Sequence, residues 1–218
     1  MPYYKHIIFD LDGTLTDSKQ GIINAAIYAF KKMGIKNPPV EKLNSLIGIP
    51  LQDYLKINNL ILDTLIDDAV AHFRRYYSEK GAFENKPYPG IMQLLEEMSK
   101  NGVNMYISTA KYEKYAKVIV DHFGFSPFMK DMAGADAAGL HASKTELTAK
   151  IIKRNNITDL KHSVMIGDKD IDMQAGKNTN IDTIGVTYGF GAMEELEKEK
   201  PTYIVNSVAE LSNVLCKK

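Results

Sequence analysis

Residues 4–14 of the chain read Tyr4-Lys5-His6-Ile7-Ile8-Phe9-Asp10-Leu11-Asp12-Gly13-Thr14. The first six are mostly apolar or aromatic, so we expect a buried strand over Tyr4–Phe9. Asp10 and Asp12 follow at its C-terminal end, the edge at which open parallel sheets bind ligands. Two carboxylates one residue apart can share a cation and divide nucleophilic and acid–base roles. Taken alone, however, Asp12-Gly13 is also an ordinary turn.

Outward from this stretch, strand-like runs alternate with helical patterns, as in a parallel sheet covered by helices. We expect further strands at Val103–Thr109, Ser163–Ile166, Thr183–Thr187 and Tyr203–Val205. Ser143 and Glu146 have the spacing of a capping box, which predicts a helix start there. The fold class is therefore α/β, with a Rossmann-like three-layer core around a parallel sheet.

The region from residue 17 to residue 86 interrupts this alternation. One helical pattern in it ends at Gly34, and another covers Asp63–Lys80 and ends at Gly81. The return segment Lys86-Pro87-Tyr88-Pro89-Gly90 is too rich in proline for a helix interior. We therefore expect an inserted all-helical domain over residues 17–86 and a core domain formed by residues 1–16 and 87–218.

The composition is that of an ordinary globular protein, with 218 residues, 44% hydrophobic and 25% charged. Lys and Arg number 27 and so do Asp and Glu, so there is no general attraction to nucleic acid or anionic membranes. No apolar run approaches the length that spans a bilayer, and the single cysteine, Cys216, cannot form an internal disulfide. We expect a soluble cytoplasmic protein, a monomer or weak dimer, with no nucleic-acid or membrane partner.

Three further groups of polar residues follow expected strands or begin a helix. They are Ile107-Ser108-Thr109-Ala110-Lys111, the pair Ser143-Lys144, and Gly167-Asp168-Lys169-Asp170-Ile171-Asp172. Each alone has a plainer explanation: a threonine in a turn, a solvated lysine, or acidic residues at the start of a helix. Their order along the chain, after Asp10 and Asp12, is what makes them informative.

In that order, the four groups resemble the four motifs of the haloacid dehalogenase (HAD) superfamily. The resemblance implies a phosphatase in which Asp10 accepts the phosphoryl group as an aspartyl-phosphate. Asp12 would protonate the leaving oxygen and later deprotonate the attacking water, a task that suits an acid with a raised pKa. The substrate would be a small phosphorylated metabolite.

The same resemblance implies a magnesium site and a phosphate cradle. Mg²⁺ would be held by Asp10, the backbone carbonyl of Asp12 and Asp168, with Asp172 acting through water or through neighbouring side chains. The phosphate would lie against Thr109, Ala110, Lys144 and the backbone around Gly13.

The insert lies between the first and second motifs, which resembles the C1 cap of HAD enzymes and implies a small substrate. Ile22 stands where β-phosphoglucomutases carry a histidine, which argues against a mutase. Leu46–Leu51, Tyr88-Pro89-Gly90 and Gly185–Gly191 resemble the phosphoglycolate phosphatase branch. Pyrophosphatases and 5′-nucleotidases with the same cap are alternatives, as is a non-catalytic HAD-fold regulator or phosphate-binding protein.

Two remaining features are ambiguous. Arg74 and Arg75, on the second helical pattern of the insert, are candidate ligands for a second anionic group of the substrate, although a solvated helix face also explains them. Gly189-Phe190-Gly191 does not extend to a dinucleotide-binding fingerprint, and we expect a turn near the rim of the site.

Overall fold

The computed structural model describes residues 3–35, 43, 46–47, 51–58, 60–136 and 143–216. The chain divides into two compact units, Met1–Asp17 with Pro87–Lys218, and Ser18–Lys86. Within the stretch Leu46–Leu51, Gly48-Ile49-Pro50 lie outside the described residues.

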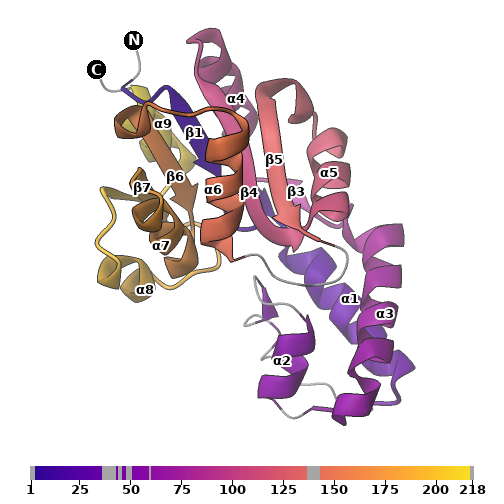
Figure 1. Ribbon diagram of the computed structural model, residues 1–218. Helices are drawn as coiled ribbons and strands as arrows, with labels where there is room; N and C mark the ends of the chain where they lie inside the picture. Colours follow the sequence, from indigo (N-terminus) through magenta and orange to yellow (C-terminus); the bar gives the residue numbers. More distant parts are fainter. Residues whose placement is uncertain are drawn as a thin grey trace. The chain divides into compact units, whose positions relative to one another are not determined.

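The first unit is built on a six-stranded sheet in which every pair of neighbours is parallel (Figure 1). Its strands, in spatial order, are β5 (Met129–Ala135), β4 (Asn104–Tyr112), β1 (His6–Phe9), β6 (Ser163–Gly167), β7 (Asp182–Val186) and β8 (Tyr203–Val205). The chain order moves from β1 outward to β5 and then back across to β8. This confirms the predicted α/β class and places the predicted strands in one sheet.

The sequence did not predict β5. Its residues, Met129-Lys130-Asp131-Met132-Ala133-Gly134-Ala135, include no β-branched side chain, so their strand propensity is low. Two backbone groups of β5 are hydrogen-bonded by side chains instead of by another strand. The Gly134 N–H donates to the Glu113 carboxylate at 3.0 Å, and Arg154 donates to the Met132 carbonyl at 2.8 Å. Tertiary pairing with β4 therefore forms this strand, and polar side chains cap its edge.

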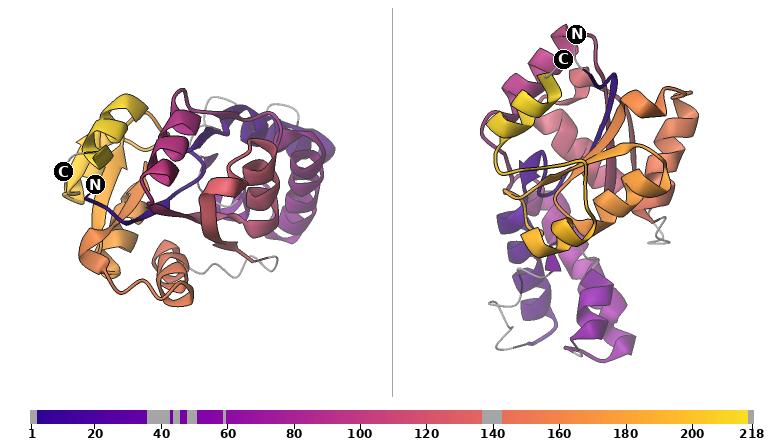
Figure 2. Two further views of the ribbon diagram at one scale, coloured as in Figure 1. Left: turned by 90° about the horizontal axis from the view of Figure 1, so that it is seen from above. Right: turned by 90° about the vertical axis from the view of Figure 1, so that its left-hand side faces the viewer.

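Helices cover both faces of the sheet, which gives the three layers. In Figures 1 and 2, α6 (Lys144–Arg154) and α7 (Asp170–Asn178) lie on one face, and α4 (Ile91–Lys100) and α9 (Val208–Cys216) lie on the other. The remaining helices of the unit are α5 (Glu113–His122), α8 (Met193–Lys198) and two short 3₁₀ turns, η4 (Ser126–Phe128) and η5 (Leu160–His162).

The core lies between the sheet and these helices. Under α6, the buried side chains of Ile8, Tyr106 and Met165 pack with Leu147 and Ile151. Burying an aliphatic or aromatic side chain of this size stabilises a fold by about 1.5–3 kcal/mol. The sheet is thereby a rigid platform for the polar residues that follow its strands.

Within the described residues of the second unit, the regular secondary structure is helical, apart from Lys86, which belongs to a short strand. It contains α1 (Lys19–Lys32), α2 (Leu51–Ile57), the 3₁₀ turn η2 (Asp63–Leu65), α3 (Ile66–Tyr76) and the π-helical turn η3 (Tyr77–Gly81). The helix expected over Asp63–Lys80 thus starts as a 3₁₀ turn and widens to a π turn that ends at Gly81. Glu84 joins α1 to α3, because its carboxylate accepts hydrogen bonds from Asn24 at 2.9 Å and Tyr76 at 3.0 Å.

The short strands β2 (Thr16–Asp17) and β3 (Lys86–Pro87) pair where the chain passes from one unit to the other. Throughout the described parts of the chain, we find no helix with the length and apolar character needed to cross a bilayer.

Candidate active site

Three buried aspartates come together at the C-terminal edge of the sheet. Asp10 follows β1 and Asp168 follows β6, and the pairing of Phe9 with Ile166 brings the two strand ends side by side. The Asp10 N–H donates to the Ile166 carbonyl at 2.8 Å, which extends this pairing by one bond. Asp172 adds its carboxylate from the first turn of α7. One oxygen from each of the three lies within 4.8 Å of the others.

The ammonium group of Lys144 lies among these carboxylates. It is the first residue of α6, and the predicted capping box of Ser143 and Glu146 is present at that helix start. Its ammonium donates to Asp10 and lies 2.9 Å from an oxygen of Asp172. The Lys144 side chain is 4% exposed, so this is a buried ion-pair cluster rather than a surface contact.

The electrostatics of the cluster show a shortage of positive charge. Burial raises the pKa of Asp10 and that of Asp168, and repulsion from Asp172 raises both further, although Lys144 opposes the rise at Asp10. Burial alone would lower the pKa of Lys144, but Asp10 and Asp172 outweigh it and raise that pKa above its usual value. Three buried carboxylates facing one ammonium fit a hard divalent cation, whose preferred ligands are carboxylate oxygens.

A loop after β7 fixes Asp168. The backbone N–H groups of Phe190 and Gly191 donate to one Asp168 oxygen at 2.7 and 3.2 Å. Gly191 is needed there because a Cβ would stand 1.9 Å from the Asp168 carbonyl oxygen. Gly13 approaches from the other side with φ +94°, and its Cβ would stand 2.3 Å from the Asp168 carboxylate. These contacts orient the carboxylate that we expect to bind metal.

Asp12 has a different partner from the other three aspartates. Its Oδ2 accepts from the Lys111 ammonium at 2.6 Å, and the two side chains are 13% and 9% exposed respectively. Its Oδ1 is buried, and within the described residues it has no hydrogen-bond partner. Asp12 is thus held by one oxygen and presents the other as an acceptor.

The end of β4 supplies the expected hydroxyl. Thr109 is 1% exposed, and its Oγ1 accepts from the Lys111 N–H at 3.2 Å. Ser108 is engaged elsewhere, since its hydroxyl lies 3.0 Å from that of Thr148 on α6. The register pairs Phe9 with Ile107, so Thr109 lies on β4 two residues beyond the residue that pairs with the end of β1, at the same edge of the sheet as Asp10. Ala110, next along β4, is exposed.

The profile of the haloacid dehalogenase-like hydrolase family matches residues 7–186, a span that holds every one of these polar residues. The chain belongs to the haloacid dehalogenase-like hydrolases. The matched span includes all the residues from Asp10 to Asp172 that the sequence analysis assigned to the four motifs.

Relatives of this HAD-like hydrolase carry several names. A 5′-nucleotidase of Pseudomonas aeruginosa is 33% identical over 97% of this chain and 96% of its own length. The tyrosine-protein kinase PtkA of Mycobacterium tuberculosis is 30% identical over 92% of this chain and 68% of its own length. A phosphoglycolate phosphatase of Vibrio parahaemolyticus is 26% identical over 97% and 96%.

A solved structure has the same fold as this HAD-like hydrolase. A protein of Clostridium difficile, provisionally named a phosphatase, is 36% identical and superposes with a TM-score of 0.91. The match covers 97% of this chain and 98% of that protein.

Sequence reasoning missed two features of the site in this HAD-like hydrolase. The Gly189–Gly191 loop was expected as a simple turn, but its backbone holds Asp168. Lys111 had no role of its own in the sequence analysis, whereas its side chain pairs with Asp12. The two glycines around Phe190 were the available signal for the loop, and no residue pattern signals the contact between Lys111 and Asp12.

Arg75, a candidate ligand for a second anionic group of the substrate, pairs with Glu79 at 3.4 Å on an exposed face of the helical unit.

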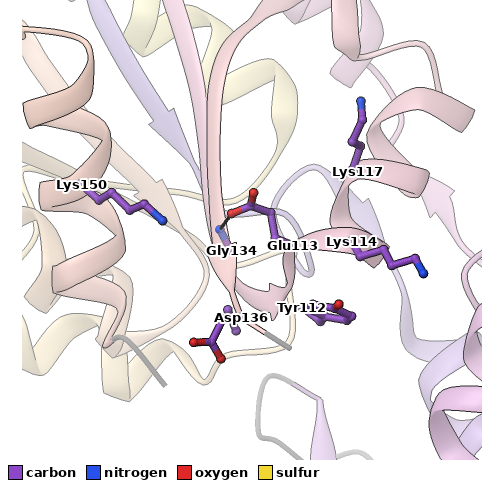
Figure 3. Close-up of a pocket in the computed structure, with 8 residues that line it drawn as sticks. Tyr112, Glu113, Lys114, Lys117, Gly134, Asp136 and Lys150 are labelled. Carbon is purple, nitrogen blue, oxygen red and sulfur yellow. Dashed lines mark hydrogen bonds between the residues drawn. The ribbon is translucent and has the colours of Figure 1, made fainter. Parts of the chain in front are cut away.

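A hollow of about 450 Å³ lies beside the end of β5 and contains none of the predicted site residues (Figure 3). It is lined by residues of α5, β5 and α6, among them Lys114, Lys117 and Lys150. In Figure 3 the ammonium groups of Lys114 and Lys117 point away from that of Lys150, so the three do not converge on one point. Lys117 also pairs with Asp121 at 3.2 Å. The hollow therefore lacks the features of an anion site.

Proposed function

We propose that this HAD-like hydrolase is a magnesium-dependent phosphatase that hydrolyses a small phosphate monoester through an aspartyl-phosphate on Asp10. The observation that carries the proposal is the convergence of Asp10, Asp168 and Asp172 on Lys144 at the ligand-binding edge of the sheet. The names of the relatives, which include a 5′-nucleotidase and a phosphoglycolate phosphatase, support phosphate esters as substrates.

The proposed reaction has two displacements at phosphorus. In the first, an Asp10 oxygen forms a bond to phosphorus while the bond from phosphorus to the ester oxygen breaks, and Asp12 gives its proton to that oxygen. In the second, Asp12 takes a proton from water, the water oxygen bonds to phosphorus, and the bond to Asp10 breaks. Inorganic phosphate is released and Asp10 returns to its carboxylate form.

Lys144 and Thr109 would hold the transferring group. Lys144 is already fixed by Asp10 and Asp172, so it needs no reorganisation to oppose the charge of the phosphoryl oxygens. Thr109 would donate from its hydroxyl, and backbone N–H groups around Gly13 and Ala110 would add donors. Phosphoryl transfer asks a protein mainly for positioning and charge stabilisation, which this arrangement provides.

Asp10, Asp168 and Asp172 would hold Mg²⁺ in this proposal, with the Asp12 backbone carbonyl as a further ligand. When bound, the ion supplies positive charge that offsets the phosphate and the crowded carboxylates. The Phe190 and Gly191 amides keep Asp168 oriented for this task.

We propose that residues 17–86, which the sequence predicts as a domain, act as a C1 cap that admits small esters and excludes bulk water during the reaction. The partner would then be a small phosphorylated metabolite rather than nucleic acid or a membrane. The cytoplasm is the compartment we propose, and it suits a chain whose single cysteine is free.

The test is phosphate release from a panel of small esters with and without Mg²⁺. The panel contains phosphoglycolate, pyrophosphate, nucleoside 5′-monophosphates and sugar phosphates. One substrate well above the others in kcat/KM, and only with Mg²⁺, is the expected result. Nucleoside monophosphates form a second candidate class, because the 5′-nucleotidase relative is 33% identical over nearly the whole chain. Absence of release from every ester would favour the non-catalytic regulator.

A further inference from the structure

The ion pair between Lys111 and Asp12 links two parts of the proposed machinery. The Lys111 ammonium lies 2.6 Å from Asp12 Oδ2, and its backbone N–H donates to the Thr109 hydroxyl at 3.2 Å. Its side chain is 9% exposed, so the charge is nearly withdrawn from solvent. Lys111 therefore stands between the phosphate cradle and the group that meets the leaving oxygen, a position that a solvated lysine would not take.

The two oxygens of Asp12 have separate surroundings. Oδ2 holds Lys111, while Oδ1 is buried and has no hydrogen-bond partner in the described part of the chain. If Oδ1 meets the ester oxygen, the ammonium lies on the other side of the same carboxylate. With hydrogen bonds of about 2.8 Å on each side, the ammonium is roughly 5 to 7 Å from the ester oxygen. An anionic group two or three bonds from the ester oxygen comes within hydrogen-bond reach of it.

The charge of Lys111 makes such a contact favourable. A nearly buried ammonium is stabilised by negative groups, and its contact with Asp12 at 2.6 Å is with a carboxylate that must also serve the leaving oxygen. A leaving alcohol with its own carboxylate or phosphate supplies a further negative group while Asp12 serves the leaving oxygen. A neutral leaving alcohol, such as a nucleoside, supplies none.

We propose that Lys111 is a specificity residue that binds an anionic group on the leaving alcohol. The substrate class is then small phosphate monoesters, or pyrophosphate, with a second negative group close to the ester oxygen. This inference rests on the proposed function, because it places Asp12 at the leaving oxygen. It favours a phosphoglycolate-like ester over nucleoside monophosphates within that function.

The experiment compares two esters that differ in the anionic group alone. Phosphoglycolate and 2-hydroxyethyl phosphate have the same two-carbon skeleton, with a carboxylate in the first and a CH₂OH group in the second. Steady-state kcat and KM with Mg²⁺ are measured for the wild type, Lys111→Met and Lys111→Arg. Lys114→Met is the matched control, an exposed lysine three residues further along the chain. Pyrophosphate separates a second phosphate from a carboxylate as the preferred group.

The wild type should prefer phosphoglycolate by about tenfold to a hundredfold in kcat/KM, the range of one charge-assisted hydrogen bond. Lys111→Met should lower kcat/KM for both esters, because Asp12 loses its ammonium partner, but it should lower kcat/KM at least about tenfold more for phosphoglycolate and so abolish the preference. Lys111→Arg should retain part of the preference, and Lys114→Met all of it. An equal loss on both esters would overturn the proposal and leave Lys111 as a positioning residue for Asp12.

A binding measurement keeps the two proposals distinguishable. If the wild type hydrolyses no ester of the whole panel, the proposed function fails. Calorimetric titration of both esters into Mg²⁺-loaded Asp10→Asn protein, with and without Lys111→Met, still reports on specificity. A phosphoglycolate preference of tenfold or more that Lys111→Met removes supports the anionic site. Equal affinities for the two esters, or a preference that survives Lys111→Met, contradict it.

Discussion

Replacing Lys144 by Met should strongly destabilise the metal-free protein. Met has nearly the shape of Lys without the charge, so the change removes the ammonium from Asp10 and Asp172 with little loss of packing. All three side chains are at least nine-tenths buried, at 4%, 9% and 2% exposure. Removing one partner from a buried ion pair costs about 3–5 kcal/mol, because the remaining charges are left in a low-dielectric site.

The expected decrease in the free energy of unfolding is therefore about 3–5 kcal/mol at mildly alkaline pH with chelator. It should be smaller at lower pH, because Asp10 can then escape its isolation by taking up a proton. Adding Asp172→Asn removes one of the stranded charges and should recover about 0.5–3 kcal/mol, the usual size of coupling between contacting residues.

The assay is urea unfolding followed by far-ultraviolet circular dichroism. The matched control is Lys150→Met, an exposed lysine on the same helix, which should change stability by less than about 0.5 kcal/mol. If Lys144→Met were no more destabilising than Lys150→Met, or if the effect of Asp172→Asn were simply additive, the ion-pair cluster would not exist as described.

Three other changes test the rest of the site. Gly191→Ala should displace the loop from Asp168, because the new Cβ would stand 1.9 Å from a backbone oxygen, and should weaken Mg²⁺ binding about tenfold to a hundredfold in a calorimetric titration. Unchanged affinity would show that the loop amides do not orient a ligand. Asp168→Ala should raise the Mg²⁺ concentration needed for half-maximal activity, and a variant with the wild-type Mg²⁺ requirement would remove Asp168 from the metal site. In chelator, the raised pKa values of Asp10 and Asp168 mean that the folded chain binds more protons than the unfolded chain above about pH 4, so stability should fall as the pH rises towards neutrality. Mg²⁺ should accordingly raise the melting temperature more at about pH 8 than at about pH 6, and equal shifts at the two pH values would contradict this charge balance.

The sequence predicted most of the sheet because its central strands are apolar and end in distinctive polar residues. The predicted strand beginning at Tyr4 and those beginning at Val103 and Ser163 became β1, β4 and β6, within a few residues at each end. In contrast, β5 has low strand propensity and lies at the edge of the sheet, where pairing with one neighbour and capping by Glu113 decide its conformation. Such tertiary effects leave no local pattern to read.

The predicted site residues could be brought together from their order alone, since parallel strands end at one edge of the sheet. What order cannot give is the set of contacts made by backbone groups and by long side chains. The amides of Phe190 and Gly191 hold Asp168 with atoms that every residue possesses, so residue type carries little information about them. Lys111 lies on β4 and contacts Asp12, which follows the neighbouring strand β1, so the contact depends on how the two strands are paired.

The assignment of Asp10 as the phosphoryl acceptor is tested most directly by trapping the covalent intermediate. The enzyme is mixed with a hydrolysed ester and Mg²⁺, quenched in acid within the first turnover, reduced with borohydride and digested for peptide mass spectrometry. Borohydride converts an aspartyl-phosphate to homoserine, so we expect homoserine at position 10, and none in a reaction without ester. Homoserine at position 12, or none at either position despite rapid turnover, would show that Asp10 is not the phosphoryl acceptor.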